Sequence, residues 1–173
     1  MRAKMPLLAN VNLLKLSRRT PRRPALAQVG TVRQSRYVTQ AADCVQQGGP
    51  GREWSDKPPV VASYVLVKLC EQYCMVALLE NMPEGYCSVG SGQLLNHRAP
   101  VVIGAEVTFT VRCTEARGSY SKWEVVVEDS HGVVGDGWMA FAVVHKADFE
   151  ARRIAPKHAA VIPTQPRQEP VSQ

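Results

Sequence analysis

The sequence predicts an α+β domain in which an antiparallel sheet curls around one long, mostly buried helix. The prediction rests on one long apolar stretch without Gly or Pro, four later segments with strand character, and short turns between most of them. With 173 residues, 45% of them hydrophobic, the chain is long enough for one domain with a proper core. No apolar run approaches the roughly 20 residues that a membrane-spanning helix needs.

The helix is predicted over residues 63–79, "SYVLVKLCEQYCMVALL". Its few polar side chains, Lys68 and Glu71 among them, fall largely on one stripe, so we expect the helix to be covered on most sides. Ser63 is placed to act as its N-cap. The following "NMPEG" is expected to end the helix.

The strands are predicted from alternation and from the turns between them. The predicted strands are Tyr86–His97, Ala105–Ala116, 121–130 and 133–146. The second alternates cleanly, with Val107, Phe109, Val111 and Cys113 on one face. "RGSY" and "HG" provide the two later turns. A helix followed by four such strands predicts an antiparallel meander.

The flanks divide the chain into an arm at 1–42, a connector at 43–59, the domain at 60–153 and a disordered tail at 154–173. The arm holds nine Lys/Arg and no acidic residue, and it includes a short apolar side over Leu7–Leu16. This composition is typical of an organellar transit peptide and predicts a mitochondrial location. The alternative is a cytoplasmic protein with a disordered basic tail.

Charge and cysteine content narrow the range of partners. The net charge of +6 belongs to the arm, because residues 43–173 hold 12 basic and 15 acidic side chains. A nucleic-acid-binding face is therefore not expected on the folded part. A membrane partner is not expected either, because no apolar run is long enough to span a membrane. The five cysteines are odd in number, lack a CxxC pair and have no histidine at zinc-ligand spacing. We therefore expect them to be core thiols in a reducing compartment. No metal and no cofactor are expected.

Three side chains are candidates for chemistry: Ser63, Glu71 and His97. Each has a purely structural interpretation, as a helix cap, as a solvated partner of Lys68 and as a polar strand end. Together they indicate more, because Ser63 and Glu71 lie a little over two helical turns apart and point to a similar side. A hydroxyl, a carboxylate and an imidazole that converge beside backbone N–H groups can hydrolyse an acyl compound.

The order of "SVG", "H-x-APV--G" and "D--G-VG-G" after this helix resembles the hot-dog-fold acyl-CoA thioesterases, especially the fluoroacetyl-CoA thioesterase type. The resemblance covers residues from about 60 to 152. It implies a hot-dog fold, catalytic roles for Glu71 and His97, and a substrate-contacting glycine at Gly90. Ser63 would stand where the family has a threonine, and Trp54 is the candidate for its aromatic lid. Because serine lacks the methyl group that restricts a threonine rotamer, fluoroacetyl specificity is not carried over.

The resemblance implies an acyl-CoA thioesterase that hydrolyses a short-chain acyl-CoA to free acid and CoA, as a homodimer or higher homo-oligomer. The alternative is a non-catalytic hot-dog domain that acts as an acyl-binding or structural subunit. A third reading, an acyl-CoA hydratase, would need an Asp/His pair that His131, His145 and His158 do not suggest. The presence of all three polar groups favours the hydrolase.

Overall fold

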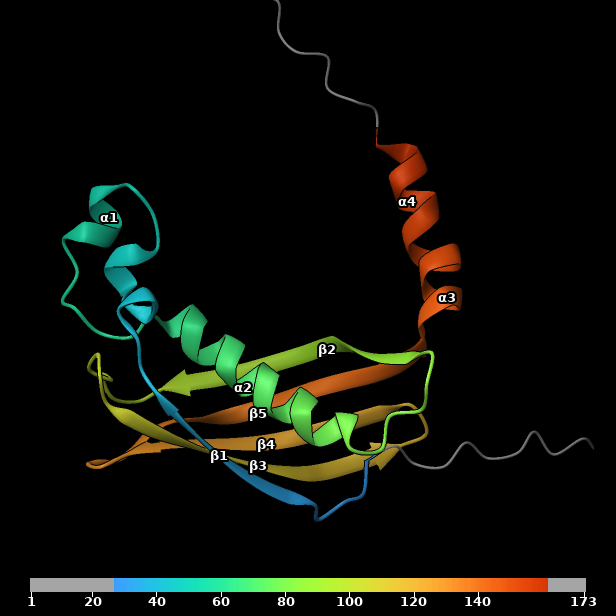
Figure 1. Cartoon of the computed structure of the whole chain (residues 1–173), viewed down its shortest axis with the longest axis horizontal. Helices are drawn as coiled ribbons and strands as arrows, with labels where there is room; N and C mark the ends of the chain where they lie inside the picture. Colours follow the sequence, from blue (N-terminus) through green and yellow to red (C-terminus); the bar gives the residue numbers. More distant parts are fainter. Residues whose placement is uncertain (1–26, 162–173) are drawn as a thin grey trace, which may run out of the picture.

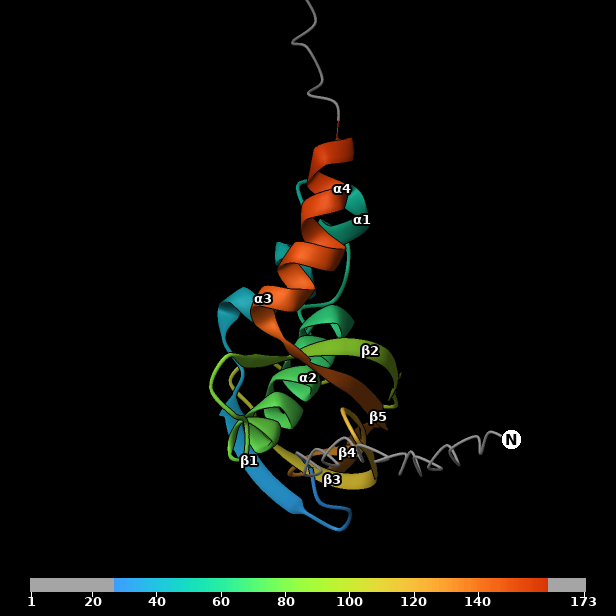
Figure 2. The same ribbon diagram turned by 90° about the vertical axis from the view of Figure 1, so that its right-hand side faces the viewer.

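The computed structural model describes residues 27–161. Five antiparallel strands form one sheet in the order β1-β3-β4-β5-β2, and the sheet curls around α2 (Ser63–Leu79) (Figure 1). The view turned by 90° shows α2 inside this curl (Figure 2). The predicted α+β class, the central helix and its bounds are confirmed.

The sheet has five strands, of which the last four were predicted. The strands are β1 (Val32–Val38), β2 (Tyr86–His97), β3 (Glu106–Arg117), β4 (Tyr120–Asp129) and β5 (Gly132–His145). The ends of β2 to β5 lie within one residue of the predictions. Along β3 and β4 buried and accessible positions alternate, which is why their sequences showed a period of two.

The predicted meander is wrong for its first strand. β3, β4 and β5 are consecutive neighbours, but β2 lies on the far side of β5 and pairs with it from Tyr86↔His145 to His97↔Gly135. The chain therefore crosses from one edge of the sheet to β3 after β2 ends. Alternation reports which face a side chain occupies, and it carries no information on which strand lies alongside.

The sheet also begins earlier than the predicted domain start at residue 60. β1 lies within the segment assigned to the basic arm and pairs antiparallel with β3, from Val32↔Arg112 to Val38↔Glu106. Its side chains are exposed or half-buried, as expected of an edge strand, so it lacks a buried apolar alternation that sequence analysis could detect. Residues 1–26, with the predicted targeting helix, lie outside the described residues.

The predicted connector is folded. It contains η1 (Ala41–Asp43), η2 (Val45–Gln47) and α1 (Arg52–Ser55), and isolated bridges join Cys44 to Val61 and Val60 to Val102. The Trp54 indole packs directly against Gly48 and Gly49. A Cβ on Gly48 would lie 2.3 Å from the ring, so these glycines make room for the indole.

After β5 the chain continues as α3 (Lys146–Phe149), a π-helical segment η3 (Glu150–Ile154) and α4 (Ala155–Ala160). These turns project away from the sheet (Figures 1 and 2) and contain no buried residue. Residues 154–160 are therefore helical where a disordered tail was predicted. Residues 162–173 lie outside the described part.

The core lies between α2 and the concave face of the sheet. From α2 it receives a row of buried residues spaced four apart: Leu66, Cys70, Cys74 and Leu78. From the sheet it receives large side chains that are almost completely buried: Phe109, Trp123, Met139 and Phe141. All five cysteines are free, and burial raises the pKa of the Cys70 thiol to about 12, which keeps it protonated and unreactive at neutral pH.

Candidate active site

The N-terminal end of α2 meets the end of β2 through Ser63 and His97. Ser63 is the first residue of the helix and not its N-cap as predicted, because Ala62 holds the capping position. Ala62 has no polar side chain, so it makes no side-chain cap bond. Its Oγ lies 3.0 Å from Nδ1 of His97. The structure therefore brings together two of the three predicted catalytic side chains.

The other ring nitrogen of His97 is ready for a ligand. His97 is half-buried, and its Nε2 is inaccessible to solvent and has no hydrogen-bond partner among the described residues. A buried polar atom without a partner is unfavourable unless a ligand or water supplies one. When Nδ1 donates its proton to Ser63, Nε2 is left as an acceptor, and the other tautomer makes Nε2 a donor. Either state suits proton transfer at Nε2.

Two turns further along α2, Glu71 faces the backbone of β2 at Gly90. A Cβ built on Gly90 would lie 2.9 Å from Oε1 of Glu71, closer than real Cβ atoms ordinarily approach an oxygen. Only glycine leaves the carboxylate and the strand this close without displacement. The register of β2 against β5 shifts between Gly90 and Gly92, which marks a bulge at Ser91. Bulges interrupt the ladder and redirect the backbone, and they are frequent next to active sites.

A cavity of about 290 Å³ lies at this point. Its lining comes from the middle of α2, β2 and β5: Glu71, Gly90, Gly92, Gln93, Met139, Ala140 and Phe141. The volume lies just below the usual range for ligand cavities, about 300–1,000 Å³. Glu71 supplies the one ionisable group of this lining. The sequence did not predict the β5 residues, because their part in the site depends on how β5 pairs with β2.

The predicted convergence of all three side chains is only partly observed. Among the described residues no hydrogen bond joins Glu71 to His97. Eight helical residues separate Ser63 from Glu71, which is roughly 12 Å along the axis. β2 runs back along α2, so the end of the strand meets the start of the helix and the middle of the strand meets the middle of the helix. The site consists of two adjoining parts, Ser63–His97 and Glu71–Gly90.

Trp54 lies beside the first part. A second cavity of about 470 Å³ is bordered by the connector and the start of α2, with Trp54, Ser63 and Tyr64 in its wall. The Trp54 and Tyr64 rings meet edge to face with centroids 6.2 Å apart. The residue proposed as an aromatic lid thus lines the same cavity as Ser63.

No cluster of three or more His, Cys, Asp or Glu side chains that would hold a metal ion is present among residues 27–161. None of the helices in this part of the chain is both long and apolar enough to span a membrane.

Comparison with known proteins decides the family. Residues 28–147, more than two thirds of the chain, match the family model described as "FlK: Fluoroacetyl-CoA-specific thioesterase". The chain belongs to this family. It is a thioester hydrolase with a hot-dog fold, as the resemblance implied. The match begins at residue 28, which agrees with the inclusion of β1 in the sheet.

Individual members of the FlK family and its structural neighbours support the assignment. The fluoroacetyl-CoA thioesterase of Streptantibioticus cattleyicolor is 29% identical over 100 residues, which cover 58% of this chain and 72% of that protein. A threonine-to-serine variant of FlK, solved in complex with acetyl-CoA, is 27% identical with a TM-score of 0.71, covering 76% of this chain and 98% of the other. A hot-dog-like protein from Thermanaerovibrio acidaminovorans is 27% identical with a TM-score of 0.65, covering 73% and 90%.

Proposed function

We propose that this FlK-family thioesterase hydrolyses short acyl-CoA thioesters to the free acid and CoA, and that Glu71, His97, Ser63 and Gly90 form its active site. The observation that carries the proposal is the close approach of the Glu71 carboxylate to the bulged backbone at Gly90, in the wall of a small cavity. A thioester carbonyl that enters this cavity has backbone on one side and a carboxylate on the other.

In the proposed reaction, Glu71 accepts a proton from a water molecule as the water oxygen attacks the carbonyl carbon. Negative charge develops on the carbonyl oxygen, and backbone N–H groups near the bulge at Gly90 stabilise it. The carbon–sulfur bond then breaks, and the CoA sulfur leaves as a thiolate or takes a proton. Attack by the Glu71 carboxylate itself, followed by hydrolysis of an anhydride, is the covalent alternative.

His97 and Ser63 handle the proton and the orientation of the substrate. Nε2 of His97, buried and unpaired in the described residues, exchanges a proton with the water or the leaving group. Ser63 fixes the imidazole through its contact with Nδ1. The first helical turn of α2 adds a partial positive charge, which favours the anionic transition state.

A short acyl group fits the volume of the cavity, which Met139 and Phe141 border from β5. The fluoroacetyl group named for the family is one member of this size class. We propose the size class and not that particular substrate.

We also propose that the protein is a homodimer through the β2 edge. β2 is the last strand of the sheet, so one side of its backbone has no neighbour within the described chain. Pairing with β2 of a second copy would cover this edge and continue the sheet. Size-exclusion chromatography with light scattering would give twice the monomer mass of 19.0 kDa.

Mitochondrial import remains a proposal that rests on the acid-free basic residues before β1. A fusion of residues 1–42 to a fluorescent protein would accumulate in mitochondria if the proposal holds, and diffuse through the cytoplasm if it does not.

The function is tested with the full chain and a panel of acyl-CoAs from acetyl to palmitoyl, with thiol release as the readout. We expect the highest kcat/KM on the shortest acyl groups and a steep fall with chain length. Absence of thiol release from every acyl-CoA would refute the proposed function. A flat chain-length profile would refute the size class.

A further inference from the structure

The outer side of the sheet carries a compact ionic cluster directly behind His97. The carboxylate of Asp136 on β5 accepts a hydrogen bond from Nδ2 of Asn96 at 2.9 Å and one from Nη2 of Arg98 at 3.0 Å. Nε of Arg98 donates to the second carboxylate oxygen. One side chain thus holds the residue before His97 and the residue after it.

The strand register explains why Asp136 reaches both neighbours. Asn96 pairs with Asp136, and His97 pairs with Gly135. Because successive side chains of a strand point to opposite faces, Asn96 and Arg98 lie on the face opposite to His97. The backbone is also tied here, since the amide of Arg98 donates to the carbonyl of Val134 at 2.8 Å.

On the inner face, His97 has no side chain opposite it. Its partner Gly135 is buried, and a Cβ there would lie 3.3 Å from the carbonyl oxygen of Asn96 and 3.5 Å from the Leu66 side chain. The cross-strand position that ordinarily steers a side chain is therefore empty at His97. The hydrogen bond to Ser63 is the contact that fixes the ring from its Nδ1 side.

We propose that Asp136 is a positioning residue for His97: by clamping Asn96 and Arg98 it fixes the strand segment that presents the imidazole to Ser63. This inference rests on the proposed function of His97. Asp136 does not touch the reacting atoms. Hydrogen bonds from Arg98 and then Asn96 hold the pKa of the Asp136 carboxyl below its usual range, so the clamp is ionised whenever the enzyme operates near neutral pH.

Overall stability is not the main role of this pair. The Arg98 side chain is 54% exposed and that of Asp136 is 30% exposed. Ion pairs at such positions contribute little to folding. A matched pair exists at the other end of α2, where Arg33 binds Glu80 with side chains 48% and 42% exposed. Glu80 therefore serves as a control for loss of an exposed, doubly bonded carboxylate.

The test compares Asp136→Asn with Glu80→Gln in the full-length enzyme. For Asp136→Asn we expect kcat to fall about tenfold, because small misplacement of a catalytic group is costly. KM should stay within about twofold and Tm within about 3 °C of wild type. Glu80→Gln should leave kcat unchanged. Equal kcat in the two variants, or a loss confined to KM, would overturn the positioning role.

A double variant separates action through His97 from a general effect. In a His97→Ala background, adding Asp136→Asn should lower kcat no further, because residues that act as a unit are not additive. A further tenfold loss would show that Asp136 acts elsewhere.

An assay without turnover distinguishes failure of this inference from failure of the proposed function. The imidazole ¹⁵N signals of His97, identified by their absence in His97→Gln, report its hydrogen bond to Ser63 whether or not a substrate is hydrolysed. In Asp136→Asn these signals should move toward those of the exposed His131, and in Glu80→Gln they should not. Unchanged signals in Asp136→Asn would refute the clamp even in an enzyme that is active on acyl-CoA.

Discussion

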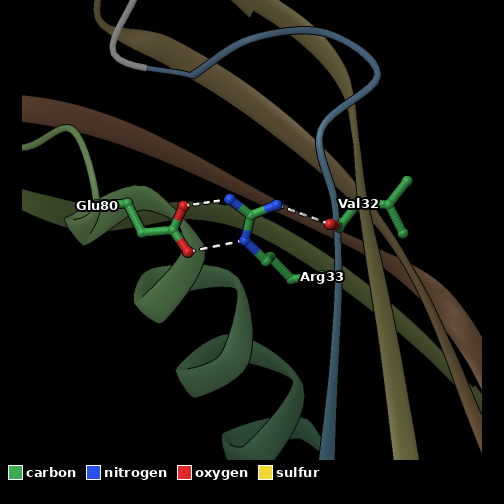
Figure 3. Close-up of polar contacts among 3 residues, drawn as sticks. All are labelled: Val32, Arg33 and Glu80. Carbon is green, nitrogen blue, oxygen red and sulfur yellow. Dashed lines mark hydrogen bonds and ion pairs between the residues drawn. The ribbon is translucent and has the colours of Figure 1, made fainter.

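Two ion pairs of the same kind have different neighbours, one at the C-terminal end of α2 and one beside the strand residue that contacts the start of α2. At the C-terminal end, Arg33 of β1 binds Glu80, with Nε 2.7 Å from Oε1, and also donates to the carbonyl of Val32 (Figure 3). At the N-terminal end, Arg98 binds Asp136 behind His97. The first pair joins an edge strand to the end of a helix, and the second braces a candidate catalytic strand. The consequence of an ion pair is thus set by what its flanking residues contact.

The largest expected effect is at Glu71, which lies on α2 between the two ends. Glu71→Gln keeps the shape of the side chain and removes its basicity, so kcat should fall by about 100-fold or more, as expected when a general base is lost. Thiol release from acetyl-CoA measures the loss, and circular dichroism confirms the fold. Activity within about twofold of the Glu80→Gln control would remove Glu71 from the site and place function entirely at the Ser63 end.

A second test concerns the close approach at the bulge. Gly90→Ala places a methyl group 2.9 Å from Oε1 of Glu71, so the carboxylate must move, and we expect kcat/KM to fall about tenfold. Gly92→Ala is the comparison, because its Cβ would meet the Trp138 ring at 3.2 Å and not Glu71. We expect the smaller loss there. The reverse order of the two losses would contradict the assignment of Gly90 as the substrate-facing glycine.

The smallest expected effect is at the Glu80 end, and it concerns stability alone. Arg33 holds the pKa of the Glu80 carboxyl below its ordinary value, so the stabilisation is complete above that ordinary value, about 4. It is lost as the pH falls through the lowered pKa. Glu80→Gln should therefore reduce Tm by less than about 3 °C at pH 7, and by progressively less as the pH falls through the lowered pKa.

A thermal scan series from pH 2 to pH 7 measures this difference, with wild type at each pH as the reference. A reduction in Tm that is the same at every pH of the series would mean that Glu80 stabilises the fold through packing and not through its charge.

The elements that sequence analysis predicted correctly are those whose chemistry is local. α2 and β2 to β5 follow from an uninterrupted apolar run and from alternation, both of which are set by burial on one side. β1 was assigned to a basic arm because an exposed edge strand with two arginines has no such pattern. The residues at 43–59 were assigned to a connector because glycines such as Gly48 and Gly49 are typical of turns. The sequence does not reveal that the Trp54 indole packs on these two glycines.

For the candidate site, the sequence predicted which elements carry its side chains, and it did not predict their geometry. One helix carries Ser63 and Glu71, and one strand carries Gly90 and His97. Because the strand runs back along the helix, the last of these residues meets the first. The division into two parts follows from the rise of a helix, which keeps Ser63 and Glu71 apart. Asp136 was not predicted, because its contacts arise from the register between strands 40 residues apart in sequence. No local pattern encodes that register.

The position of Trp54 has a consequence for the study of this enzyme in solution. Its indole lies in the wall of the cavity beside Ser63, where a bound acyl-CoA would change its surroundings. The two other tryptophans are placed differently, Trp123 in the core with 1% of its surface exposed and Trp138 beneath the Lys122 ammonium group at 4.6 Å. Under the proposed function, we therefore expect the Trp54 fluorescence to change when acyl-CoA binds, and this change can be measured at equilibrium in an inactive variant without any label.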